Sequence, residues 1–184
     1  MLLGILVAGL FGVANGVLIT RFDLPPFIVT LGTLNIAYAI TRIYRTTTIS
    51  NLPPTITALG NTFDVGQTAI TYGSILMIVL YLVMWFVLRE TSWGRHLYAL
   101  GDNPEAARLA GISTTRLLIS VYTLAGLFYG IAGLLLVART QVGDPQAGQT
   151  ANLDSVTAVV LGGTSLFGGR GNILATLIGA LIVG

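Results

Sequence analysis

The glycine-rich run at residues 162–171, reading GGTSLFGGRG, contains glycines at a spacing that could bind phosphate. Gly163 and Gly168 are spaced as in a phosphate-binding loop, but Gly169-Arg170 stands where such a loop needs Lys followed by Ser or Thr. The run also lacks the third glycine and the preceding strand of a dinucleotide fingerprint. The spacing therefore predicts neither ATP binding by this loop nor a nucleotide cofactor.

Groups for catalysis or metal binding are scarce elsewhere. The sequence has no cysteine and a single histidine, His96, which cannot form a metal site with its neighbours. The clear apolar runs contain no carboxylate, so no nucleophile and base can pair inside a membrane span. We expect no catalytic residue, metal or cofactor, and a protein that is not an enzyme.

Three polar residues share one face of the second apolar run. Asn35, Tyr38 and Arg42 lie at positions i, i+3 and i+7, and polar groups within a membrane usually face a bundle interior or a water-filled path. They are therefore a candidate translocation path. The alternative is that Asn35 bonds a neighbouring helix while Arg42 extends to the lipid headgroups.

A short capped helix is predicted within residues 99–112, reading ALGDNPEAARLAGI. Asn103 is a suitable N-cap, Pro104 fits the first helical position, and Glu105 lies at the positive end of the helix dipole. Gly111 supplies the left-handed C-terminal stop. About two turns are too few to be stable alone, because isolated helices need roughly 12–15 residues.

This helix must therefore lean on a neighbour or a partner. Ala106, Ala107 and Ala110 give it a shallow apolar face, and Glu105 and Arg108 give it a charged edge able to pair internally or across an interface. We expect a partner to dock here. The alternative is a surface loop that happens to be helical.

The composition indicates whether the helices that position these residues lie in water or in a lipid bilayer. Hydrophobic residues make up 54% of the chain and charged residues 9%, against about 25% charged in soluble domains. The net charge is +2 and every basic residue is Arg, which does not indicate a nucleic-acid surface. The chain is predicted to be an integral membrane protein in contact with lipid.

Long apolar runs at about residues 2–20, 27–44, 68–88 and 117–138 are each predicted to cross the membrane. Small residues at helical spacing predict close helix packing, at Gly12 and Gly16 in the first run and at Gly126, Gly130 and Gly133 in the fourth. Residues 45–67 are polar and are expected to form a long loop. Together these runs predict a single all-α polytopic transmembrane bundle over residues 1–184.

The last third is less regular. Residues 154–171 contain a short apolar run followed by the glycines, and a further apolar run starts at about residue 172. A broken or re-entrant helix fits this pattern, because irregular backbone at membrane depth is tolerated where protein buries it or a cavity borders it. The glycines that would break the helix are Gly162, Gly163, Gly168 and Gly169.

The arginine distribution indicates the orientation. Five arginines fall on the side of the capped helix and three on the other, which favours the first side as cytoplasmic. Arg170 is left out of this count because the broken segment has no clear side. The counted residues are Arg21, Arg89, Arg95, Arg108 and Arg116 against Arg42, Arg45 and Arg139.

Three stretches carry a resemblance to a known family. PPFIVTLGTLNIAYAITRIY from Pro25, SWGRHLYALGDNPEAARLAGI from Ser92 and LDSVTAVVLGGTSLFGGRGNILATLIGALIVG from Leu153 occur in the family's order. The chain resembles the permease subunit of bacterial ATP-binding-cassette importers for simple sugars, of the ribose, xylose or autoinducer-2 type. Family members are longer, so the chain resembles a fragment.

The resemblance implies a multi-pass protein of the bacterial plasma (inner) membrane that moves a monosaccharide or similar small polar solute by alternating access. It implies that the capped helix is the coupling helix that docks into a cytoplasmic ATPase subunit. A periplasmic or lipid-tethered sugar-binding protein and a second permease subunit, identical or a sister, are the other implied partners. The residues that carry over are Asn103, Pro104, Glu105, Ala106, Ala107, Arg108 and Gly111.

Two other classes stay open. A secondary active transporter could use the broken helix and Arg42, although the clear spans lack the carboxylates that such proteins normally use for coupling. A stand-alone membrane protein is the other.

Overall fold

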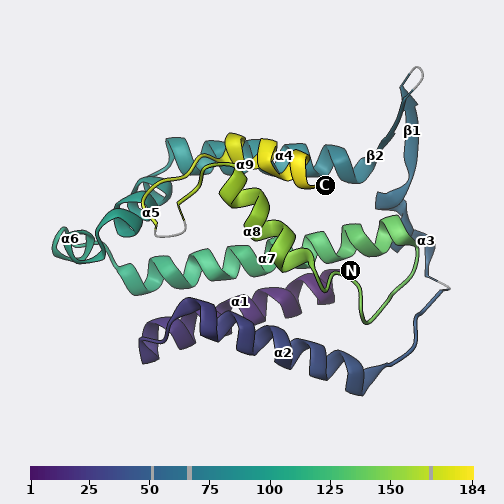
Figure 1. Ribbon diagram of the computed structural model, residues 1–184, viewed down its shortest axis with the longest axis horizontal. Coiled ribbons are helices and arrows are strands. Elements are labelled where there is room, and N and C mark those ends of the chain that lie inside the picture. The colour runs from purple at the N-terminus through teal and green to yellow at the C-terminus, as the bar shows by residue number, and fades with distance from the viewer. Residues whose placement is uncertain (51, 66–67, 166–167) are drawn as a thin grey trace. The chain divides into compact units, whose positions relative to one another are not determined.

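The computed structural model of the chain describes residues 1–50, 52–65, 68–165 and 168–184, and this part is almost entirely helical (Figure 1). Its elements in chain order are α1 (Leu2–Phe22), α2 (Pro26–Tyr44), α3 (Pro54–Thr57), the 3-10 helix η1 (Ala58–Gly60), β1 (Thr62–Val65), β2 (Thr68–Thr71), α4 (Tyr72–Glu90), α5 (Ser92–Asp102), α6 (Pro104–Leu109), α7 (Thr114–Thr140), α8 (Ala151–Leu161) and α9 (Ile173–Val183).

Four of the described helices are long and apolar enough to cross a membrane. They are α1, α2, α4 and α7, with 21, 19, 19 and 27 residues. At 1.5 Å per residue even 19 residues reach about 28 Å, close to the thickness of the hydrocarbon core. Many of their large apolar side chains are exposed, as expected where the solvent is lipid. The predicted all-α polytopic helical bundle is confirmed.

The chain divides into two compact units. Residues 1–74 and 118–147 form the first unit, and residues 75–117 and 148–184 form the second. The first unit contains α1, α2 and most of α7, and the second contains most of α4, together with α5, α6, α8 and α9. Each unit is described by itself below.

Helices α1 and α7 run antiparallel in the first unit and meet at glycines. A Cβ atom on Gly16 would lie 2.8 Å from the Cα of Ile119, and Gly12 lies against the backbone of Tyr122. No side chain larger than hydrogen fits at either position. The close packing predicted from Gly12 and Gly16 is therefore confirmed, and glycine is needed there because two backbones approach each other.

The glycines of α7 behave in two ways. A Cβ on Gly126 would lie 2.5 Å from the carbonyl oxygen of Ala8, and one on Gly130 would lie 2.8 Å from the Cα of Ile5. A Cβ on Gly133 would meet nothing within 4 Å. The prediction of close packing is confirmed for the first two glycines and wrong for Gly133.

The polar segment expected to be a loop contains short regular elements. Of residues 45–67, residues 51, 66 and 67 lie outside the described part of the chain. The others include α3, η1 and β1, and β1 pairs antiparallel with β2 in the register Thr62↔Thr71 and Phe63↔Ile70. The membrane helix expected from residue 68 therefore begins at Tyr72. β-branched Thr and Ile favour the strand, and the ring of Phe63 lies 5.3 Å from that of Tyr72.

The same segment is attached to the end of α7. Ile49 and Gly143 exchange two backbone hydrogen bonds of 2.9 Å, and Gly60 lies against the backbone of Ala138 and Arg139. Ile49 and Gly60 of this segment thus lie against the turn after α7 and the end of α7, respectively.

Candidate functional site

The predicted capped helix is present as α6. The Oδ1 atom of Asn103 accepts hydrogen bonds from the amides of Glu105 at 3.1 Å and Ala106 at 3.0 Å, and Pro104 occupies the first turn. This satisfies two of the amides that a helix N-terminus leaves without a partner. The predicted N-cap is confirmed.

A glycine ends α6 by a complete Schellman motif. Gly111 has φ 83° and its amide donates to the carbonyl of Arg108 at 3.0 Å, while the amide of Ile112 donates to the carbonyl of Ala107 at 3.1 Å. Only glycine adopts this left-handed conformation without strain. The predicted stop at Gly111 is confirmed, and α6 has well-defined ends despite its six residues.

The face that α6 exposes differs from the predicted one. Ala107 is 3% exposed and packs inward, whereas Ala106 and Ala110 are exposed. Leu109 is 80% exposed. The large apolar side chain that α6 exposes is therefore Leu109, which the alanine pattern did not indicate, whereas Ala107 is buried.

Two charged side chains flank this exposed leucine. Glu105 and Arg108 are exposed, and within the described part of the chain neither takes part in an ion pair. The internal pairing that their spacing permits is not formed. Both charged side chains are exposed on the same short helix as Leu109, so α6 presents an apolar residue together with an acidic and a basic group.

A second helix, α5, precedes α6 and was not predicted. Thr91 caps it, since its Oγ1 accepts from the amide of Gly94 at 3.3 Å. Gly94 and Leu100 are buried, and Leu97 is half-buried on the same side. The apolar spacing of Leu97 and Leu100 after a threonine was the signal for this amphipathic helix.

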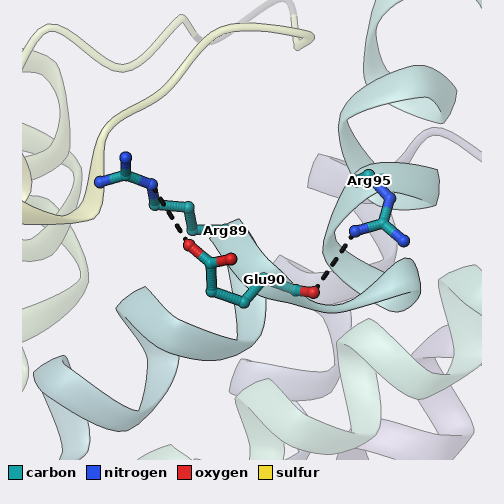
Figure 2. A network of polar contacts seen from close by, with 3 residues as sticks. All are labelled: Arg89, Glu90 and Arg95. Atoms are coloured by element: carbon teal, nitrogen blue, oxygen red, sulfur yellow. Dashed lines mark hydrogen bonds and ion pairs between the residues drawn. The ribbon is translucent and has the colours of Figure 1, made fainter.

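Helices α4 and α5 meet at a sharp corner held by charged side chains (Figure 2). The Nε atom of Arg89 lies 3.4 Å from Oε1 of Glu90, and an Nη atom of Arg95 donates to the backbone carbonyl of Glu90 at 3.3 Å. The guanidinium of Arg89 also lies 5.3 Å from the ring centre of Trp85. Of these contacts, the hydrogen bond from Arg95 is the one that joins α5 to the end of α4.

The expected broken helix corresponds to α8 and α9, two apolar helices of 11 residues each. Gly163 ends α8 with φ 72° and a second Schellman motif, in which the amides of Gly163 and Thr164 donate to Val160 and Val159. Asn172 caps α9 by accepting from the amide of Leu174 at 2.9 Å. The end of α8 and the start of α9 are thus both capped, which gives several of their backbone groups hydrogen-bond partners.

The other predicted glycines of this segment make backbone contacts. A Cβ on Gly162 would lie 2.6 Å from the Cα of Thr176 in α9, while Gly168 and Gly169 lie against Gly101 and Asp102 at the end of α5. Leu166 and Phe167, the centre of the glycine-rich run, lie outside the described residues.

The candidate translocation residues lie on α2. Tyr38 is half-buried, whereas Asn35 and Arg42 are exposed. The amide of Asn35 donates to the carbonyl of Leu31 at 2.8 Å, within its own helix, so this structure does not form the interhelical bond considered as an alternative. A role of these residues in translocation remains a prediction.

Within the described ranges no three His, Cys, Asp or Glu side chains cluster as a metal site would require. His96 is exposed on α5. The features that stand out are instead a capped, exposed α6, the helix α5 that supports it, and a glycine loop that touches α5.

The sequence matches a known family over residues 1–184, the one described as branched-chain amino acid transport system / permease component. No solved structure is significantly similar.

Curated relatives align with nearly the whole chain. The fructose import permease protein FrcC of Rhizobium meliloti is 49% identical over 98% of this chain and 52% of its own length. The ribose import permease protein RbsC of Bacillus subtilis is 41% identical over 92% and 53%, and the L-arabinose ABC transporter permease protein AraH of Azospirillum brasilense is 38% identical over 98% and 53%. The chain spans about half the length of the curated relatives it matches.

Proposed function

Because the chain belongs to the family of branched-chain amino acid transport system permease components, we propose that it acts as a permease subunit of an ATP-binding-cassette importer for a monosaccharide. The alignment with FrcC, at 49% identity over 98% of this chain, carries this proposal. Three relatives are named as permeases for fructose, ribose and L-arabinose, which favours a sugar over an amino acid as the solute. The protein would lie in the bacterial plasma membrane.

The energy for import would come from a separate ATPase subunit. The sequence contains no G-x-x-x-x-G-K-[ST] loop. Helix α6 is suited to receive such a partner, because it exposes Leu109, Glu105 and Arg108 while Ala107 is buried. A central apolar residue with charged neighbours is a common composition of protein interfaces.

The transport cycle would be alternating access. Closure of an ATPase dimer on ATP would displace α6 in each of two permease subunits and switch a cavity between them from outward to inward facing. A sugar-binding protein would deliver the solute from outside. Asn35, Tyr38 and Arg42 on α2 are the residues we propose for the path, because a sugar needs hydrogen-bonding groups there.

The direct test is uptake by the assembled importer in proteoliposomes, with the permease, its ATPase and its binding protein present together. We expect accumulation of labelled fructose or ribose that requires ATP inside the vesicles. L-leucine is the matched control solute. Uptake of leucine but not of sugars would overturn the sugar assignment, and sugar uptake without ATP would favour a secondary transporter.

A further inference from the structure

The loop between α8 and α9 runs past the C-terminal end of α5 (Figure 1), and at three glycines the two backbones lie in direct contact. A Cβ on Gly101 would lie 2.6 Å from the amide nitrogen of Gly169, and a Cβ on Gly168 would lie 2.7 Å from the carbonyl oxygen of Gly101. A Cβ on Gly169 would lie 3.0 Å from the Cα of Asp102. Gly101, Gly168 and Gly169, called here the glycine contact, therefore exclude side chains from both surfaces.

The loop has a shape that fits this position. Gly168 and Gly169 have φ values of 95° and 72°, which place both in the left-handed region. The hydroxyl of Tyr98, about one turn before Gly101 on α5, donates to the carbonyl of Gly171 at 3.1 Å. A side-chain hydrogen bond thus holds the loop at a second point on α5.

On the other side of the loop, α8 and α9 pack as one body. A Cβ on Gly162 in the α8 cap would lie 2.6 Å from the Cα of Thr176, and Gly179 of α9 lies against the carbonyl of Ala158 in α8. The hydroxyls of Thr164 and Thr176 are 3.2 Å apart and share a hydrogen bond. A displacement of the loop is therefore passed to both helices.

The end of α5 that bears Gly101 is directly followed by α6. Helix α5 ends at Asp102 and α6 begins at Pro104, so Asn103 is the only residue between them. Its amide donates to the carbonyl of Ala99 in α5 at 3.1 Å, while its side chain caps α6. One residue thus belongs to both helices, and a movement of α6 pulls directly on the end of α5.

We propose that Gly101, Gly168 and Gly169 are positioning residues for transport, which transmit the displacement of α6 to the α8–α9 pair. Contacting backbones have no rotamers to absorb a movement, and close-packed protein has low compressibility. This inference rests on the proposed function and adds the internal route by which the ATPase would act. It also places Arg170 on the same membrane side as α6, the side favoured as cytoplasmic by the arginine count.

The first test replaces one glycine on α5. Gly101→Ala strengthens the helix, because Ala is the best helix former, but its methyl group collides with Gly169. In the assembled importer we expect sugar uptake per ATP hydrolysed to fall about tenfold, a typical coupling loss, with binding of the ATPase unchanged. The control is Gly133→Ala in α7, where a Cβ meets nothing within 4 Å. Equal uptake per ATP in the two variants would overturn the proposal.

The second test separates contact from backbone strain in the loop. Gly168→Ala and Gly163→Ala both place alanine at a positive φ, of 95° and 72°, but only Gly168 contacts Gly101. We expect Gly168→Ala to lose coupling and Gly163→Ala to retain it. Loss of the same size in both variants would show that strain alone is responsible.

Cysteine cross-linking tests the contact without relying on steric disruption. The chain has no cysteine, so Asp102→Cys with Gly169→Cys gives one defined pair. A Cβ on Gly169 would lie 3.3 Å from that of Asp102, slightly shorter than the usual Cβ–Cβ separation in disulfides of about 3.5–4.5 Å. We expect the disulfide to form in membranes, and because Gly169→Cys itself places a side chain in the glycine contact, disulfide formation and not uptake is the readout. Absence of the disulfide would overturn the proposal.

Failure of this proposal is distinguishable from failure of the proposed function. An unsubstituted importer that shows no ATP-dependent sugar uptake contradicts the function. A working importer in which Gly101→Ala behaves like Gly133→Ala contradicts the glycine contact alone. If Gly101→Ala does not reach the membrane, the cross-linking experiment decides.

Discussion

Glycines bring backbones together in both units of this protein, but they do so in different ways. In the first unit Gly9, Gly12 and Gly16 lie along α1 and meet α7 over successive turns. In the second unit Gly101, Gly168 and Gly169 meet at one point, where a helix end touches a loop. The first arrangement holds two membrane helices side by side, and the second is a local contact between a helix end and a loop, with the Tyr98–Gly171 hydrogen bond beside it.

The α1–α7 contact and the glycine contact are therefore suited to different roles. A contact spread over a helix stabilises packing, and its energy is the sum of many small dispersion terms. A local contact between a helix end and a loop adds fewer such terms, and its proposed role is in coupling instead. Substitutions in the first unit should therefore change the amount of folded protein, whereas substitutions in the second should change coupling.

The largest effect is expected from Gly12→Leu in the centre of the α1–α7 contact. The side chain would be driven into the backbone of Tyr122, and overpacking of this kind costs about 1–3 kcal/mol. We expect a large loss of monodisperse protein after detergent extraction and a lower unfolding temperature. Gly133→Leu on α7 is the matched control and should extract normally, since no atom lies within 4 Å of a Cβ there. Equal yields would remove the distinction between the two units.

A smaller effect, confined to partner binding, is expected from Glu105→Lys on α6. The exposed carboxylate is available to a partner, and its reversal should weaken binding of the ATPase by about tenfold or more. Folded yield should stay the same. Arg116→Glu is the control, because it reverses an exposed charge on the same predicted side outside α6. Binding measured by pull-down that falls equally in both variants would contradict docking at α6.

Leu109→Asp tests the same surface through its apolar residue. Since Leu109 is 80% exposed, the substitution should leave the unit folded, yet it would place a charge at the centre of the proposed interface. We expect ATPase binding to fall at least as far as in Glu105→Lys. By contrast, Ala107→Trp is expected to disturb folding as well, because Ala107 is 3% exposed. Unchanged binding by the Leu109 variant would exclude this leucine from the interface.

The smallest effect is expected from the helix caps. Asn103→Ala removes the acceptor for the amides of Glu105 and Ala106, at a cost of about 1 kcal/mol. Hydrogen exchange at these two amides should accelerate about fivefold, because a loss of about 1 kcal/mol in local stability raises the population of the open state by about that factor. Asn103→Ser retains a capping oxygen and should restore protection. Exchange that is no faster in the alanine variant would show that the cap does not stabilise α6.

The sequence predicted those parts of the fold that follow from local chemistry. The membrane helices follow from charge-free length, and both ends of α6 follow from Asn103, Pro104 and Gly111, since capping depends on neighbours along the chain. The close packing at Gly12 and Gly16 was also predictable, because small residues four apart leave a groove on a helix.

Features that depend on distant residues were missed or predicted wrongly. Ala107 points inward and Leu109 outward because of the direction in which α6 leaves α5, which no spacing encodes. Thr68–Thr71 is a strand because Thr62–Val65 lies opposite to it. The contact between Gly101 and Gly168 joins segments remote in sequence, so the glycines could be identified as helix breakers but not as partners of α5.

The hydrogen bond from Tyr98 to Gly171 has a consequence for the order of events during synthesis. About 70 residues separate the two, so at about 5–20 residues per second the ribosome adds Gly171 several seconds after Tyr98. Through that interval the end of α5 has no loop to contact. The contact between α5 and the loop after α8 thus forms late, after α4 and α7 have been made. A docking partner that arrives during translation would meet α5 and α6 before they contact the loop between α8 and α9.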